Sequence, residues 1–192
     1  MLRRIFGVIT LNAAKYREIA EDKSATGQAG IIVAIALLIQ GFIVGFIDVD
    51  GQTIAVRADT AQGFGEAVAV LISGFIAWVI TAWVLVFFAK SFRCKTNIGE
   101  MLRVTGYVKI FAIVIFLSFL TPVIPAFVFI TEFLVFIIAF LELFGYIIGV
   151  REATGLSTRK AFFAAIAADI INFSVVLFIT HLVLRAFGIS GA

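Results

Sequence analysis

The stretch Ile31-Ile-Val-Ala-Ile-Ala-Leu-Leu-Ile39 is apolar on every face. A transmembrane β-strand would instead alternate apolar and polar side chains over about ten residues. A helix needs roughly 17–25 apolar residues to cross about 30 Å of hydrocarbon, and the apolar segment around this stretch covers about residues 30–47. The stretch therefore predicts a transmembrane helix.

The composition extends this prediction to the whole chain. Of the 192 residues, 62% are hydrophobic and only 14% are charged, and the mean hydropathy is +1.16. Soluble domains are about 45–50% apolar and about 25% charged. The balance excludes a disordered chain, and the single Cys94 excludes a disulfide-built module. We expect an integral membrane protein.

Four further segments are long and apolar enough to cross a bilayer, at about residues 67–89, 107–124, 126–150 and 161–187. Two prolines in Thr121-Pro-Val-Ile-Pro125 predict a tight turn between the third and fourth segments. The predicted fold class is all-α, a polytopic five-transmembrane-helix bundle. It divides into a cytoplasmic segment at 1–27, a membrane domain at 28–187 and a tail at 188–192.

The basic residues predict the orientation. Of the 15 Lys and Arg residues, 13 lie before the first span, between the second and third, or between the fourth and fifth, which all face one side. Cytoplasmic loops carry the excess of Lys and Arg, so the N-terminus is predicted to be cytoplasmic and the C-terminus outside, in the plasma (inner) membrane. This topology explains the pI of 9.2 without a nucleic-acid partner.

The segment at 1–27 is too short in its apolar run for a signal peptide, so we expect it in the mature protein. Its apolar residues recur at helical spacing and its basic residues occupy other faces. Two arrangements fit this pattern. An amphipathic interfacial helix would lie flat on the cytoplasmic leaflet, and a packed helix would lie under the bundle.

Three features together resemble the Yip family of Ypt-interacting membrane proteins. They are the opening Arg4-Ile-Phe-Gly-Val-Ile-Thr with Tyr16-Arg-Glu-Ile19, the five spans, and the cytoplasmic loop Gly149-Val-Arg-Glu-Ala-Thr-Gly-Leu-Ser-Thr-Arg-Lys-Ala161. The resemblance covers about residues 3–187. It implies a multi-pass protein of the bilayer that associates with other membrane proteins or with itself.

Eukaryotic members of that family associate with Rab-type GTPases and usually carry a longer soluble N-terminal region. With only about 27 residues before its first span, this chain looks more like the short bacterial and archaeal members. The resemblance therefore does not carry a GTPase partner over to this chain. The accessory role suggested for some prokaryotic members remains as an expectation.

The last cytoplasmic loop also has a local interpretation. Gly155 can end the fourth span because glycine tolerates a positive φ, and Ser157 or Thr158 can cap the fifth. The loop is either a plain helix connection or a docking surface, and the candidate docking residues are Arg151, Glu152, Gly155, Ser157, Arg159 and Lys160.

Ionisable residues inside a membrane are costly and usually face the bundle interior. Glu142 and Asp169 lie roughly 12 Å from the cytoplasmic boundary at about 1.5 Å per residue, with Lys109 slightly shallower. We expect Lys109 to pair with Glu142 or Asp169 in a buried polar network that includes Asn172. In the outer half, Glu132 and His181 point about 80° and 120° away from Glu142 and Asp169 at 100° per residue, which argues against a continuous relay.

Two Gly-x-x-x-Gly pairs, Gly41/Gly45 and Gly145/Gly149, remove side-chain bulk where helices approach closely. They predict packing either within the bundle or between two chains. The sequence holds no cluster typical of a metal site, no phosphate-binding loop and no nucleophile elbow, so no catalytic, cofactor or metal site is expected.

Two functions remain. The first is a non-catalytic, membrane-organising or accessory partner of other membrane proteins. The alternative is a small permease, or a transporter subunit, that moves a polar solute or protons past Asp169, Glu142 and Lys109. A polar cavity around Asp169 would favour the alternative, and a dry interface of paired side chains would weaken it.

Overall fold

The computed structural model describes residues 1–50, 53–56, 59–120 and 127–189, with the backbone alone at 48–50, 53–56, 115, 117–120, 127–128 and 131–132. The elements in chain order are α1 (Leu2–Ile9), α2 (Ala13–Glu21), α3 (Ala25–Phe46), β1 (Ile47–Asp50), β2 (Thr53–Val56), α4 (Thr60–Ser91), α5 (Ile98–Val108), the 3₁₀ helix η1 (Phe111–Leu120), α6 (Phe127–Thr154) and α7 (Thr158–Ala186). The fold is helical, with one short hairpin.

Among the described residues, four helices are long and apolar enough to cross a membrane: Ala25–Phe46, Thr60–Ser91, Phe133–Thr154 and Thr158–Ala186. They coincide with the predicted first, second, fourth and fifth spans. Each helix begins before the predicted span or extends past it. For example, α4 begins at Thr60 because the Asp59 side chain accepts hydrogen bonds from the amides of Ala61 and Gln62, both at 3.0 Å.

The third predicted span, at 107–124, is not one α-helix. The i→i−3 bonds characteristic of a 3₁₀ helix begin where Ile110 donates to the Tyr107 carbonyl at 3.1 Å, and they continue from Ala112 to Lys109. The run Phe111-Ala-Ile-Val-Ile-Phe is rich in β-branched and aromatic residues, which have lower α-helix propensity than Ala or Leu. The predicted turn at Thr121-Pro-Val-Ile-Pro125 lies outside the described residues.

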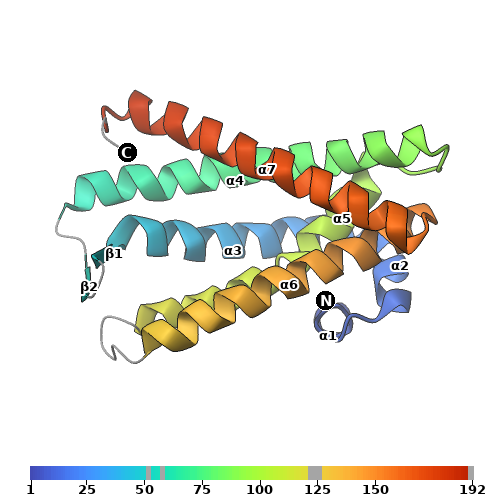
Figure 1. Ribbon diagram of the computed structural model, residues 1–192, viewed down its shortest axis with the longest axis horizontal. Helices are drawn as coiled ribbons and strands as arrows, with labels where there is room; N and C mark the ends of the chain where they lie inside the picture. The colour runs from blue at the N-terminus through green and yellow to red at the C-terminus, as the bar shows by residue number, and fades with distance from the viewer. Residues whose placement is uncertain (51–52, 57–58, 121–126, 190–192) are drawn as a thin grey trace.

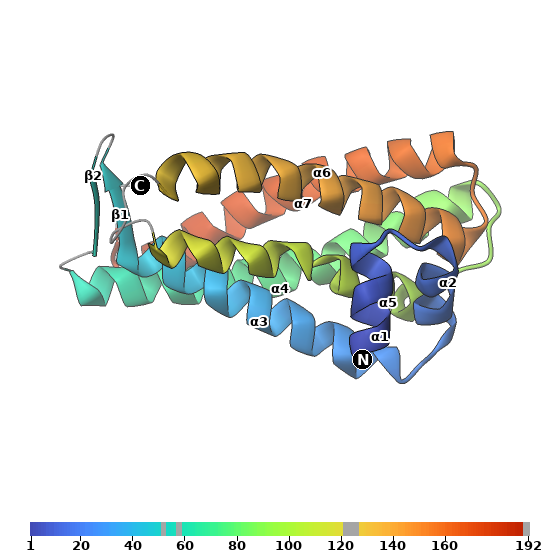
Figure 2. The same cartoon turned by 90° about the horizontal axis from the view of Figure 1, so that it is seen from below.

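The segments that close the bundle gather at its two ends. Figures 1 and 2 place α1, α2 and the α4–α5 and α6–α7 connections toward one end, and the hairpin and the C-terminus at the other. The connections predicted to share the cytoplasmic side therefore lie together. The antiparallel hairpin pairs Ile47 with Val56; its strands are too short to stand out in the hydropathy pattern, and it was not predicted.

The N-terminal segment forms two helices rather than one. Leu11 takes a positive φ of 52°, and the Asn12 side chain caps α2 by accepting from the amides of Ala14 and Lys15. Tyr16 on α2 is fully buried, whereas Phe6 on α1 is 69% exposed. The packed arrangement therefore holds for α2, and the exposed apolar face belongs to α1.

Both Gly-x-x-x-Gly pairs pack within the chain. A Cβ atom added at Gly41 would lie 2.9 Å from the carbonyl oxygen of Ala67, and one at Gly45 would overlap the carbonyl oxygen of Gly63. A Cβ at Gly145 would meet the Tyr16 hydroxyl at 3.0 Å, and one at Gly149 would overlap the Val104 side chain. The first pair joins α3 to α4, and the second seats α2 and α5 against α6.

Candidate functional site

A cavity of about 500 Å³ lies inside the bundle between α3, α4, α6 and α7. Most of its lining is aliphatic or aromatic. Its polar and ionisable lining residues are Gln40, Ser73, Trp78, Lys109, Glu142, Tyr146, Asp169 and Asn172. The four residues predicted to form a buried polar network, one from the end of α5 and three from α6 and α7, thus line one cavity.

The predicted ion pair of Lys109 forms with Glu142. The Lys109 ammonium lies 3.3 Å from Glu142 Oε2 and 5.8 Å from the centre of the Tyr146 ring. The second carboxylate oxygen of Glu142, Oε1, is buried and accepts no hydrogen bond in the described part of the chain. Asp169, half-buried, likewise has no hydrogen-bond or ion-pair partner among those residues.

Hydroxyl groups that sequence reasoning missed connect the cavity wall. Asn172 Nδ2 donates to Thr81 Oγ1 at 2.7 Å, and Thr180 Oγ1 donates to Ser73 Oγ at 3.0 Å. Both bonds join α7 to α4, and such bonds between transmembrane helices contribute about 0.6–2 kcal/mol each. Asn172 is therefore already bonded. Among the described carboxylates of the cavity, Glu142 Oε1 and Asp169 accept no hydrogen bond.

Of the two predicted outer-half residues, the structure describes the side chain of His181. His181 lies on an exposed part of α7 and does not line the cavity. Glu132 falls in α6, but its side chain lies outside the described residues. The described residues that line the cavity form one polar layer. The absence of a continuous relay stays a prediction, because the Glu132 side chain lies outside the described residues.

The predicted docking loop is partly occupied by contacts within the chain. Gly155 has a φ of 72° and ends α6 as expected, and Ser157 is the N-cap of α7 without a side-chain cap bond. Glu152 is bound by Arg17 of α2 at 2.6 Å and by Arg151 at 2.9 Å. Arg151 and Glu152 therefore bind one another, and Glu152 also binds Arg17 of α2. A docking role for these two residues stays a prediction. The exposed candidates are Gly155, Ser157, Arg159 and Lys160.

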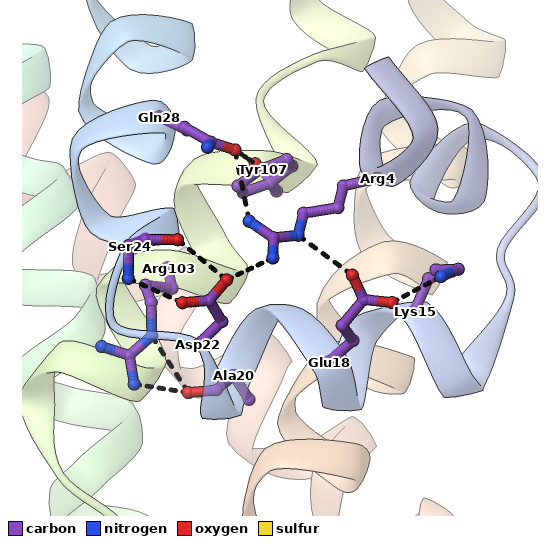
Figure 3. A network of polar contacts seen from close by, with 9 residues as sticks. All are labelled: Arg4, Lys15, Glu18, Ala20, Asp22, Ser24, Gln28, Arg103 and Tyr107. Atoms are coloured by element: carbon purple, nitrogen blue, oxygen red, sulfur yellow. Dashed lines mark hydrogen bonds and ion pairs between the residues drawn. The ribbon is translucent and has the colours of Figure 1, made fainter. Parts of the chain in front are cut away.

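Arg4 connects the N-terminal helices to the bundle in a network that sequence reasoning missed (Figure 3). Its guanidinium binds Glu18 Oε1 at 3.1 Å and Gln28 Oε1 at 3.4 Å, and it also binds Asp22. Tyr107 of α5 donates to the same Gln28 oxygen. The network therefore joins α1, α2, α3 and α5.

Arg103 makes a second attachment in the same view (Figure 3). It is 6% exposed, and its Nε atom donates to the Ala20 carbonyl at 3.0 Å. The sequence had placed this residue among the loop cations that set the orientation. An arginine between Leu102 and Val104, inside an apolar helical turn, is the signal that could have identified it as buried.

The acid dependence of this network is predictable from its carboxylates. Hydrogen bonds from Lys15 and Arg4 hold the pKa of Glu18 below its usual range, and those from Ser24 and Arg4 do the same for the pKa of Asp22. A carboxyl group whose pKa is lowered by folding stabilises the folded state at pH values above its pKa in the unfolded chain, which is about 4. That stabilisation is lost as the pH falls through the pKa of the folded state.

We expect Arg4→Met to lower the melting temperature in detergent at pH 7, and the difference from wild type to shrink as the pH falls from about 5 toward 3. Protonated carboxyl groups no longer attract the Arg4 guanidinium. At low pH the wild type therefore loses the stabilisation by these ion pairs, which the variant lacks at every pH. A difference that stays constant from pH 7 to pH 3 would contradict this account of the network.

A comparison with protein families matches the Yip1 domain to residues 6–180, which is most of the 192-residue chain. The matched range includes the residues that line the cavity, α1 from Phe6 onward and the loop between α6 and α7. No curated protein matches the chain, and no solved structure matches it.

Proposed function

Because the chain belongs to the Yip family, with the Yip1 domain covering residues 6–180, we propose that this multi-pass membrane protein is a non-catalytic accessory partner of other membrane proteins. The observation that carries the proposal is the joined cytoplasmic surface. Arg17 of α2 holds Glu152 of the last loop at 2.6 Å, so α2 and that loop form one platform. A platform held by contacts within the chain is preorganised for docking.

The proposal includes the topology. We propose five crossings of the plasma membrane, with the N-terminus in the cytoplasm and the C-terminus outside. The third crossing is the predicted span at 107–124. Its ten residues in η1 extend over about 20 Å at about 2.0 Å per residue. Reporter fusions after residue 192 and before residue 1 should give opposite sidedness, and equal sidedness would exclude five crossings.

The proposed docking surface has a polar part and an apolar part. The polar part consists of Ser157, Arg159 and Lys160, which are all exposed. The apolar part is the exposed face of α1, with Leu2 at 81% and Phe6 at 69%. Because α1 lies beside the end of the bundle (Figure 2), we propose that this apolar face rests on the cytoplasmic leaflet as an interfacial helix.

Copurification of the tagged full chain from native membranes tests the accessory role. We expect one stoichiometric membrane-protein partner, which the double variant Arg159→Ala/Lys160→Ala loses and the control Lys95→Ala, an exposed cation in another loop, retains. Retention of the partner by the double variant would contradict the docking surface. Crosslinks to a second copy alone would show self-association in place of an accessory role.

A second candidate function is favoured by the cavity around Lys109, Glu142 and Asp169. We propose passage of a polar solute or of protons past these residues as the alternative. Flux into liposomes that contain only this protein tests it, and Asp169→Asn should abolish that flux. Equal flux in liposomes with the wild type and with Asp169→Asn would exclude a role for this residue in transport.

A further inference from the structure

The cavity lining holds more acidic than basic residues. In the described lining, Lys109 is the basic residue, and Glu142 and Asp169 are the acidic ones. Lys109 already lies 3.3 Å from Glu142. Asp169 forms no ion pair within 4.0 Å in the described part of the chain and interacts with the charge of Lys109 only at longer range. Because an uncompensated charge inside a membrane is costly, the charge that would complete this site is positive.

The cavity also has spare hydrogen-bond acceptors. Glu142 Oε1 is buried and accepts no hydrogen bond within the described residues, and Asp169 accepts none there either. An ionised carboxylate only accepts, whereas an ammonium group offers three N–H donors and no acceptor. The group that complements the Asp169 carboxylate is therefore a donor as well as a cation.

The size and lining of the cavity indicate more than an inorganic ion. About 500 Å³ is many times the roughly 30 Å³ that one water molecule occupies in the liquid, and it falls within the range of about 300–1,000 Å³ typical of small-molecule sites. Trp78, Tyr146 and Phe173 contribute aromatic rings, which attract cations through their faces. In the described part of the chain no group of three His, Cys, Asp or Glu residues could hold a metal ion.

We propose that the cavity binds an organic ammonium ion, a primary amine on an apolar body, with its N–H groups on the Asp169 carboxylate. The proposal specifies the ligand class for the site of the second candidate function, on which it rests for its location alone. Binding does not require that the ligand cross the membrane. The ammonium group can come from a soluble amine or from the headgroup of phosphatidylethanolamine.

Equilibrium binding to the purified full chain tests the proposal. The probes are 2-phenylethylammonium, the neutral 2-phenylethanol and the anionic phenylacetate, in nanodiscs of phosphatidylglycerol at pH 7. We expect the ammonium ion to bind at least about tenfold more tightly than the alcohol, because a hydrogen bond to a charged group contributes about 1.5–3 kcal/mol. Tighter binding of phenylacetate, or equal binding of ammonium and alcohol, would overturn the proposal.

Variants assign the binding to this cavity. Asp169→Asn should weaken ammonium binding about tenfold or more, and Asp169→Glu should restore most of it. Glu21→Gln, which removes an exposed carboxylate of α2, should leave binding unchanged. Unchanged affinity in folded Asp169→Asn would overturn the assignment. If that variant does not fold, the comparison of the three probes on the wild type decides alone.

The source of the ammonium group is distinguished by adding phosphatidylethanolamine to the nanodiscs. If this lipid competes with 2-phenylethylammonium, the ligand is a lipid headgroup. If the lipid does not compete, the ligand is a soluble amine. Failure of this inference and failure of the transport function have different signatures. Ammonium binding without flux refutes transport alone, and proton flux without ammonium binding refutes this inference alone.

Discussion

Lys109→Met is expected to lower the free energy of unfolding in detergent by about 3 kcal/mol. Removing one member of a buried ion pair leaves the other charge uncompensated, at a cost of about 3–5 kcal/mol. The lower value applies because the side chains of Lys109 and Glu142 keep 28% and 19% of their surface exposed. The measurement is reversible unfolding of the purified full chain, with retention of helical circular dichroism as the check on folding.

The double variant Lys109→Met/Glu142→Leu separates a paired charge from a general packing defect. Because it removes both charges, it should be more stable than Lys109→Met alone, although it changes two side chains. Asp169→Asn is the matched single control, since it removes an acid that has no partner in the described residues. Additive losses in the double variant would show that the two residues are not coupled.

Gly45→Ala is expected to destabilise the protein by about 1–3 kcal/mol, the usual effect of overpacking. The added Cβ would overlap the carbonyl oxygen of Gly63, which is backbone and has no rotamer into which it can move. The α3–α4 contact would have to widen, and with it the cavity wall formed by Val44 and Val70. Thermal melting in detergent measures the effect.

Gly30→Ala is the matched control on the same helix. A Cβ at Gly30 would meet no atom within 4 Å, so the gain in helix propensity of up to about 1 kcal/mol should appear as a slightly raised melting temperature. If both substitutions raised the melting temperature, the close approach of α3 and α4 at Gly45 would be refuted.

The sequence predicted the long helices well because transmembrane spans are set by length and hydropathy. It did not predict the 3₁₀ conformation within the third span or the break in the N-terminal segment, where local backbone effects decide. The 3₁₀ conformation of η1 and the break at Leu11, with its φ of 52°, leave no mark in a hydropathy profile. The hairpin was missed for a similar reason, since its strands hold four residues each.

The depth of each residue in the membrane, estimated from the sequence, predicted which residues of the candidate site lie together. A common depth of Lys109, Glu142 and Asp169 predicted that they lie together, and the cavity contains all three. Depth could not predict which acid pairs with Lys109, because that depends on helix rotation. Nor could it predict that Arg17 would occupy Glu152 at 2.6 Å, since this contact joins segments that are 135 residues apart.

Cysteine reactivity in nanodiscs measures whether water reaches the cavity inside the bundle. In a Cys94→Ser background, Val176→Cys lies in the cavity wall, and Leu177→Cys, one residue further along α7, lies at a position 55% exposed and at nearly the same depth in the membrane. A small cationic methanethiosulfonate reagent reacts with the ionised form of cysteine, the thiolate. A thiol that faces hydrocarbon does not ionise readily and therefore reacts slowly. The account predicts that Val176→Cys is modified and Leu177→Cys is not. An unreactive Val176→Cys, or faster modification of Leu177→Cys, would contradict it.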